Sequence, residues 1–283
     1  MLTLRELDAI AGDASLYDPL NFAHRLKTIE YLDSHLFDRI DSGRLQRDAE
    51  TLKRQLRDCD DTLFEKLRSE IRSGILRGAR FRAWFDALTA TARHRVSGYD
   101  ERDAFLSELL LDETIPDPQH ALEPEMVAYQ PTPARVLLAL VDHAQVHRKD
   151  TFVDIGSGLG QVPMLVHLLT GAATVGIERE PAYCEYARRR VADLNLRPVD
   201  FRNEDARVAG YSDGTVFFLY TPVTGTMLNA VLERIHSQTH GRNIRLLTYG
   251  PCTEVAASLP WLTPAGVIAS DLESAGAFVA CQR

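Results

Sequence analysis

Hydrophobic residues recur at helical spacing through the first part of the chain, up to about residue 111. The clearest run lies between residues 44 and 72, where apolar side chains follow one another at steps of three and four positions. This spacing predicts an apolar stripe along one long amphipathic helix. Its members are Leu45, Ala49, Leu52, Leu56, Cys59, Leu63, Leu67 and Ile71. Packing in a core explains such a stripe most simply, and pairing of two copies of the chain into a homodimer is the alternative.

A shorter stripe precedes this helix and consists of Phe22, Leu26, Ile29, Leu36 and Ile40. The sequence "DSG" at 41–43 separates the two stripes, as a short turn between antiparallel helices would.

A segment with five prolines follows the helical part, "DETIPDPQHALEPEMVAYQPTP" at 112–133. Because proline disfavours helix at its own position and at the preceding one, this segment predicts an extended crossover between two domains. We place the α-helical N-terminal domain at 1–120 and the second domain at 121–283.

Strands and helices alternate in the second domain. We predict helices over 134–147, 161–169, 181–194 and 224–237, and strands over 151–155, 173–178, 198–205, 215–220 and 244–249. The last segment, 266–283, has the pattern of two strands joined by a turn. Alternation of this kind is typical of an α/β fold with a doubly wound, mostly parallel sheet. We therefore expect a Rossmann-like, seven-stranded sheet whose last strand is antiparallel.

Composition narrows the function classes. The net charge of −8 argues against a general nucleic-acid binder, which needs a basic surface. Four scattered cysteines without a CxxC pair, a charged N-terminus and the lack of a long apolar run favour a reduced, cytoplasmic protein that is not in a membrane. Four lysines against 28 arginines suggest a GC-rich bacterial genome.

One stretch departs from the acidic average. Residues 66–95 contain Lys66, Arg68, Arg72, Arg77, Arg80, Arg82, Arg93 and Arg95 against only Glu70 and Asp86. A solvated helix face is the simpler interpretation, and a docking surface for an acidic partner or substrate is the alternative.

The first strand of the second domain runs into "DIGSGLGQ" at 154–161. Ligands of doubly wound sheets bind at the carboxyl ends of the strands, near the first strand-to-helix turn. The dinucleotide fingerprint GxGxxG fails here in both frames, because Gln161 or Pro163 stands at its last position. The phosphate-binding Walker pattern fails too, because no Gly-Lys-Ser/Thr follows.

The pattern that does fit is Asp154-x-Gly156-x-Gly158-x-Gly160, which resembles motif I of class I S-adenosylmethionine-dependent methyltransferases. In that family the glycines let the backbone approach an amino acid moiety and a nucleoside. The aspartate favours an ammonium group over a phosphate. A surface carboxylate is a weak alternative for Asp154, because it interrupts an apolar strand and is costly to bury without a partner.

Two further acidic residues end the next two strands. Glu178 can accept hydrogen bonds from both ribose hydroxyls, as the equivalent residue does in nucleotide-binding relatives. The resemblance implies that Asp205 meets the adenine amino group, with the backbone N–H of Ala206 beside it. A surface carboxylate or a helix cap is the alternative for each residue. Together with the glycines, they predict S-adenosyl-L-methionine as the cofactor.

The segment "YQPTPARVLLAL" predicts a helix start. Thr132 can cap that helix with Pro133 at its first position. The free N–H groups of the first turn would then suit the carboxylate of the methionine moiety. An ordinary helix start is the alternative.

The stretch "TFVDIGSGLGQVPMLVHLLTGAATVGIE" resembles, more narrowly, the non-SET histone lysine methyltransferases of the disruptor-of-telomeric-silencing type. Gln161 is the most specific match. The likeness covers roughly residues 125–250, and it implies cofactor roles for Asp154, Gly156, Gly158, Gln161 and Glu178. It does not extend to the helical N-terminal part.

The acceptor motif departs from that family. Where the histone enzymes carry two asparagines, this chain reads Tyr220-Thr221-Pro222. The fold and the cofactor are therefore expected to match the family, whereas a histone substrate is not. We expect Tyr220, Thr221 and, from the crossover, Tyr129 to contact the methyl acceptor, with Tyr220 and Tyr129 orienting it. Packing at a domain interface is the alternative for both tyrosines.

Two functional hypotheses follow. One is a methyltransferase that acts on an N or O nucleophile of a protein or small molecule. The other is a non-catalytic module that binds S-adenosylmethionine as a sensor or assembly partner. Two His pairs at helical spacing, at 143/147 and 236/240, have no third ligand nearby, so no metal is expected.

Overall fold

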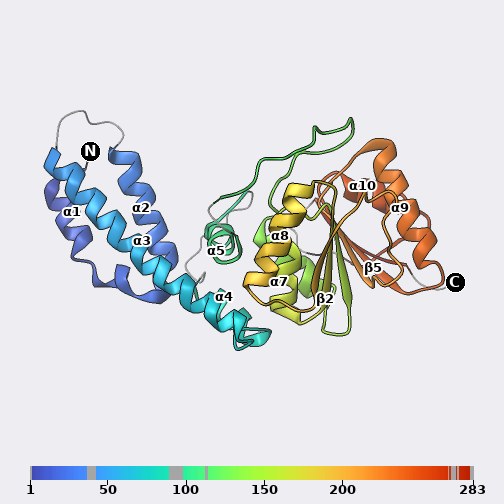
Figure 1. The fold of residues 1–283 in the computed structure, drawn as a ribbon, viewed down its shortest axis with the longest axis horizontal. Coiled ribbons are helices and arrows are strands. Elements are labelled where there is room, and N and C mark those ends of the chain that lie inside the picture. Colours follow the sequence, from blue (N-terminus) through green and yellow to red (C-terminus); the bar gives the residue numbers. More distant parts are fainter. Residues whose placement is uncertain are drawn as a thin grey trace.

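A computed structural model of the chain describes residues 2–36, 43–88, 98–111, 114–266, 268, 272 and 274–280. Two parts are visible along the long axis of the molecule (Figure 1). A group of N-terminal helices projects from one end, and a sheet flanked by helices forms the other. Within the described residues, every helix is too short or too polar to span a lipid bilayer.

The N-terminal part consists of helices, as predicted. It contains α1 (Leu4–Ala11), two short 3-10 turns (Ala14–Tyr17 and Pro19–Asn21), α2 (Phe22–Leu36), α3 (Gly43–Arg72), α4 (Ala79–Leu88) and α5 (Glu101–Leu110). The predicted stripe of α3 is buried, except for Cys59, which is half-buried. In the shorter stripe, Phe22 is buried, whereas Leu26 and Ile29 are half-buried. The side chain of Leu36, all of Ile40 and the first two residues of the predicted "DSG" turn lie outside the described part of the chain.

Two separate cores hold these helices. At the far end, α1 and the adjoining ends of α2 and α3 pack around Leu7, Leu32, Leu52 and Leu56. At the near end, the core continues from α2, α3, α4 and α5 into the helices of the sheet domain. Hydrophobic packing therefore crosses the predicted boundary at residue 120, and the division into 1–120 and 121–283 stays a prediction.

The sheet has seven strands in the order β3-β2-β1-β4-β5-β7-β6. These are β1 (Thr151–Ile155), β2 (Ala173–Glu178), β3 (Val199–Asn203), β4 (Val216–Leu219), β5 (Ile244–Tyr249), β6 (Thr263–Pro264) and β7 (Ala275–Ala280). The first five are parallel, and β7 pairs antiparallel with β5 and with β6. The predicted α/β class and the antiparallel last strand are confirmed.

Helices cover both faces of this sheet. On one face lie α6 (Ala134–His143), α7 (Gln161–Thr170) and α8 (Pro181–Asp193), and on the other α9 (Gly225–Thr239) and α10 (Cys252–Ala257). Alternate strand residues point to opposite layers. Phe152 and Phe218 face α6 and α7, whereas Val153 and Phe217 face α9, as the period of two in a strand requires.

Most predicted elements appear within a few residues of their expected ends, and there are two differences. The helix α10 was not foreseen. The first strand of the terminal hairpin, β6, lies before residue 266 and not within 266–283. Residues 267, 269–271, 273 and 281–283 of the predicted hairpin lie outside the described residues.

The basic stretch has a role that neither interpretation foresaw. Arg68 donates to the backbone carbonyls of Glu108 and Leu109 at the end of α5. Arg72 and Arg77 donate to those of Asp193 and Asn195 at the end of α8. Carbonyls of the last helical turn have no partner within their own helix. Arg72 and Arg77 therefore attach the helical part to the sheet domain, whereas Arg68 joins α3 to α5 within the helical part. Arg93 and Arg95 lie outside the described residues.

The shared core can be tested at Phe105, whose ring contacts the rings of Phe22, Phe64 and Phe85. We expect Phe105→Ala to lower the free energy of unfolding by about 3–5 kcal/mol, because it removes a buried ring and leaves a cavity. Urea unfolding measures this loss. The control is Tyr17→Ala, at a side chain that is 41% exposed, which should cost less than about 1 kcal/mol. Equal losses in the two variants would contradict a buried core around Phe105.

Candidate functional site

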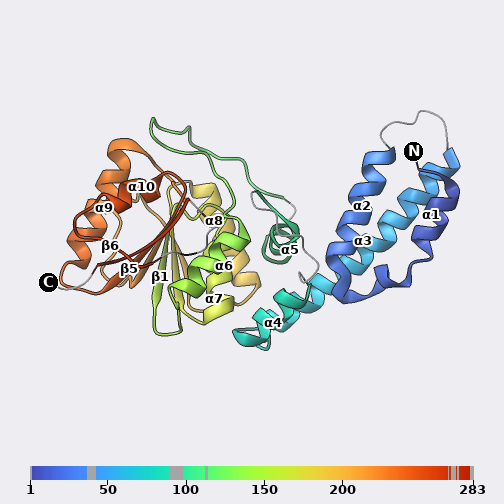
Figure 2. The ribbon, with the colours of Figure 1, turned by 180° about the vertical axis from the view of Figure 1, so that it is seen from behind.

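A cavity of about 530 Å³ opens at the carboxyl ends of the parallel strands. The extended segment between α5 and α6 passes over this end of the sheet (Figures 1 and 2). We call its residues 114–133 the strap. The cavity is lined by the strap, by the turn after β1 and by the ends of β2, β4 and β5. Of the predicted site residues, it brings together Tyr129, Thr132, Asp154, Gly156, Gly158, Gln161, Glu178, Asp205, Ala206, Tyr220 and Thr221.

Gly160 is the predicted site residue that does not line the cavity. It has φ 83° and immediately precedes α7. A Cβ on it would lie 2.4 Å from Cζ of Phe201 and 2.7 Å from Cβ of Ala187. Its lack of a side chain therefore allows α7 to pack closely on α8 and β3. Gly158, in contrast, has φ 52° and meets the ring of Tyr129 from the strap.

Asp154, the penultimate residue of β1, has an isolated carboxylate. The residue is 3% exposed, and no donor among the described residues forms a hydrogen bond with its side chain. Burial raises the pKa of this carboxyl well above its ordinary value, and the nearby charge of Glu178 raises it further. Ser157 Oγ, in the same turn, is also buried without a partner. Because an unpaired buried polar group is costly, these atoms indicate a polar or cationic ligand.

Glu178 both braces the glycine turn and faces the cavity. Its Oε2 accepts a hydrogen bond from Gly158 N at 2.7 Å, and its Oε1 accepts one from Glu180 N at 2.7 Å. Burial raises the pKa of Glu178. A carboxylate offers about four acceptor positions, so roughly two remain for a ligand. The hydrogen bond between Glu178 and the glycine turn was not predicted. An acidic residue at the end of the strand beside that turn could have suggested it.

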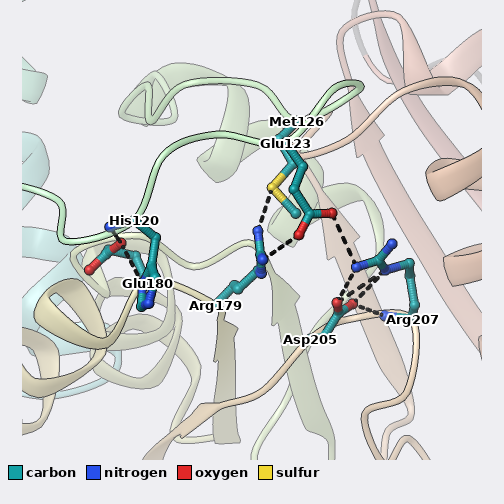
Figure 3. A network of polar contacts seen from close by, with 7 residues as sticks. All are labelled: His120, Glu123, Met126, Arg179, Glu180, Asp205 and Arg207. Atoms are coloured by element: carbon teal, nitrogen blue, oxygen red, sulfur yellow. Dashed lines mark hydrogen bonds and ion pairs between the residues drawn. The ribbon is translucent and has the colours of Figure 1, made fainter.

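Asp205, which the resemblance assigns to the adenine amino group, already has a partner within the chain. Its carboxylate accepts from the backbone N of Arg207 at 2.9 Å and from the guanidinium of the same residue. These bonds hold the pKa of Asp205 below its ordinary value. Arg207 in turn lies 3.5 Å from Glu123 of the strap (Figure 3). An adenine amino group would have to share this carboxylate with an arginine.

The strap is held over the cavity by polar contacts that sequence reasoning missed. Glu123 also pairs with Arg179, whose guanidinium reaches Sδ of Met126 at 3.1 Å (Figure 3). Glu180 accepts hydrogen bonds from the backbone N of Gln119 and His120, at 2.9 and 3.0 Å. The sequence contained a signal for these contacts. Charged residues, "ERE", stand at the end of β2, and the crossover contains acidic residues that could pair with the arginine.

Of the expected acceptor residues, Tyr220 and Thr221 follow β4, whereas Tyr129 packs over Gly158 and against the ring of Tyr183. The ring of Tyr220 packs on that of Tyr249, with 4.7 Å between the ring centroids. The hydroxyl of Tyr220 donates to Oε1 of Gln130 in the strap at 3.3 Å. Burial raises the pKa of Tyr220 and that of Tyr129, so neither hydroxyl is a base near neutral pH.

Thr221 has a hydroxyl that is already engaged. It donates to the carbonyl of Tyr249 at 2.9 Å and accepts from Cys252 N at 3.2 Å. Its φ of 40° is unusual for a residue that is not glycine. Both bonds brace the turn after β4, so the donor of this hydroxyl is not free for an acceptor.

The start of α6 differs from the prediction. Pro133, and not Thr132, is the N-cap, and it makes no side-chain cap bond. The N–H of Ala134 is taken by Oδ1 of Asp103 from α5, at 2.7 Å. A carboxylate of the chain itself therefore occupies a position where we expected that of the cofactor. Thr132 still lines the cavity.

The histidine pairs have other contacts. His143 Nε2 lies 2.9 Å from the carbonyl of Ala265, and His236 stacks on Trp261. Among the described residues, no group of three or more His, Cys, Asp or Glu side chains has the arrangement of a metal site.

A known protein family matches the segment that contains the glycine turn and Glu178. The family described as "Histone methylation protein DOT1" matches residues 126–206. The chain resembles this type of class I methyltransferase over that segment. No curated protein matches the chain. The strand order also fits the seven-stranded methyltransferase sheet that the resemblance implied.

Several solved structures are similar. An RNA methyltransferase from Salinibacter ruber, in complex with S-adenosyl-L-homocysteine, is 23% identical with a TM-score of 0.42, over 53% of this chain and 92% of that one. A mutant of MtNAS in complex with S-adenosylmethionine is 15% identical with a TM-score of 0.43, over 99% and 89%. An S-adenosylmethionine-dependent methyltransferase from Thiobacillus denitrificans is 21% identical with a TM-score of 0.36, over 46% and 56%.

The isolated carboxylate leads to a prediction about pH. A carboxyl whose pKa is raised in the folded state contributes stability below its unfolded pKa and loses that contribution as the pH rises through the folded pKa. Above that folded pKa, the buried charge of Asp154 therefore destabilises the protein without ligand. We expect Asp154→Asn to stabilise the protein there by about 1–3 kcal/mol, the scale of burying an unpaired polar group.

The measurement is urea unfolding of both proteins as a function of pH. The gain should shrink as the pH falls and Asp154 becomes protonated. A variant that is equally stable or less stable at high pH would show that the carboxylate has a partner within the chain.

Proposed function

We propose that this chain is an S-adenosylmethionine-dependent methyltransferase that acts on an N or O nucleophile of a protein or small molecule. The buried, unpaired carboxylate of Asp154 in a glycine turn carries the proposal. A ligand with a cationic amino group would supply the missing partner, and a phosphate would be repelled. The cavity volume lies in the usual range of about 300–1,000 Å³ for sites of small molecules and cofactors.

The residues of the cavity fit such a cofactor. Asp154 and Ser157 would hold the amino acid end, since both lack partners within the described chain. Glu178 would accept the ribose hydroxyls with its remaining acceptor positions. The backbone of Ala206 and the side chain of Arg179 line the end that an adenine would take. When bound, the cofactor supplies an electrophilic methyl group on a sulfonium.

The protein contributes mainly alignment to this reaction. Tyr220 and Gln130 form a hydrogen-bonded pair from which an acceptor could be oriented. The tyrosine hydroxyls are poor bases because burial raises the pKa of Tyr220 and Tyr129. The acceptor must therefore present its own free lone pair, and its proton leaves to solvent after the methyl group has moved.

Binding tests the cofactor directly. We expect calorimetry to detect S-adenosylhomocysteine and S-adenosylmethionine but not NAD, because the glycine turn presents a buried carboxylate where a pyrophosphate would need donors. Glu178→Ala should weaken binding by about 1–3 kcal/mol, the scale of hydrogen bonds to a charged group, which is about one to two decades in Kd. Tight NAD binding, or an unchanged affinity in Glu178→Ala, would exclude this assignment.

Turnover tests the acceptor end. Transfer of labelled methyl groups to a host-cell lysate, separated into proteins and small molecules, identifies the acceptor class. With that acceptor, Tyr220→Phe should lower methyl transfer about tenfold or more and leave the Kd of S-adenosylmethionine nearly unchanged, the pattern of an interaction made mainly in the transition state. Normal turnover in Tyr220→Phe would instead make Tyr220 a packing residue.

A further inference from the structure

The strap and the turn after β4 run side by side as a short antiparallel pair. Val127 N donates to the carbonyl of Pro222 at 3.1 Å, and Met126 pairs with Val223. One position earlier, the carbonyl of Glu125 accepts from Thr224 N at 2.8 Å and from Thr224 Oγ1 at 3.2 Å. This backbone contact joins the roof of the cavity to residues 220–224, which we call the acceptor turn.

The side chain of Glu125 adds a second link. Its Oε1 accepts from Thr226 N at 3.1 Å, and its Oε2 accepts from Met227 N and Thr226 Oγ1, both at 2.9 Å. The N–H groups of Met227 and Thr226 lower the pKa of Glu125. The residue before α9, Thr224, provides no side-chain cap. A carboxylate about one hundred positions earlier in the chain therefore caps this helix.

The geometry of this link is specific. Glu125 has φ 72°, in the left-handed region that residues other than glycine rarely occupy. Opposite it stands Gly225, where a Cβ would lie 2.2 Å from Oε1 of Glu125. The carboxylate thus fits only because the first residue of α9 has no side chain.

The acceptor turn also touches the cofactor side of the cavity. A Cβ on Gly156 would lie 2.4 Å from Cβ of Pro222, so the glycine turn and the acceptor turn are in close contact. On the strap, Tyr129 covers Gly158 and Gln130 holds the hydroxyl of Tyr220. A displacement of the strap relative to α9 would therefore move the groups around the reacting atoms.

We propose that Glu125 is a positioning residue that fixes the acceptor turn against the glycine turn. The inference rests on the proposed methyl transfer. Glu125 is absent from the lining of the cavity, so it acts through the turn and not by touching either substrate.

The test compares Glu125→Ala and Glu125→Gln with a control, Asp117→Ala. Asp117 is an exposed carboxylate of the same strap and has no hydrogen bond within the described chain. The assay is transfer of labelled methyl groups to the host-cell lysate at saturating S-adenosylmethionine. We expect Glu125→Ala to lower the maximal rate about tenfold or more, with an unchanged KM for S-adenosylmethionine and an unchanged Kd for S-adenosylhomocysteine. Glu125→Gln, which keeps one acceptor oxygen, should fall between Glu125→Ala and the unchanged protein.

Hydrogen exchange provides a readout that needs no acceptor. In Glu125→Ala the amides of 221–229 should exchange about tenfold faster, whereas those of 154–160 should not change. If Glu125→Ala does not fold, Glu125→Gln, which keeps the length of the side chain and one acceptor oxygen, should show a smaller increase at the same amides.

The outcomes separate the two proposals. If the unchanged protein binds no S-adenosylhomocysteine, the proposed function fails, while hydrogen exchange still tests the link between Glu125 and the turn. If cofactor binds but Glu125→Ala transfers methyl groups at the control rate, Glu125 does not position the acceptor turn. A weaker Kd in parallel with the rate would also overturn the inference, because it would indicate a general loss of structure.

Discussion

The carboxylate of Asp154 is the constraint around which the site is arranged. It is buried in a central strand and lines the cavity without a hydrogen-bond partner among the described residues, so its charged form is costly. Burial raises the pKa of Asp154, and the charge of Glu178 raises it further. Burial also raises the pKa of Glu178, which its backbone hydrogen bonds lower in part. The surrounding structure leaves Asp154 unpaired while providing hydrogen bonds for Glu178. This contrast separates a residue that braces the turn from one that can take a cationic ligand.

The strap depends on contacts of two different strengths. The ion pairs of Glu123 with Arg179 and Arg207 are partly exposed, so each is worth little and weakens with salt. The bonds that Glu125 and Glu180 accept from backbone N–H groups are better defined, because their donors are fixed in the backbone of a helix start and of a bend. The strap is therefore held more firmly by these two carboxylates than by the ion pairs of Glu123.

The helical part contributes to the site from a distance. Asp103 of α5 takes the first N–H of α6, and the hydroxyl of Tyr99 donates to the carbonyl of Pro131 at 2.8 Å. Both contacts fix the end of the strap at Tyr129 to Thr132. The arginines of α3 and of the following loop hold α5 and α8 in place through backbone carbonyls. A helical part that seemed independent in the sequence thus shapes one wall of the cavity.

The sequence by itself determined the periodic and local features. Short apolar runs between predicted helices specified β1 and β2, and the glycines and Asp154 specified a ligand turn, because these signals depend on residues a few positions apart. The tertiary structure decided which carboxylates are free. Asp103 replaces the predicted ligand at α6 from 31 positions away, and Glu125 caps a helix 101 positions later. Such partners are chosen by how the elements pack, and spacing along the chain carries no record of that.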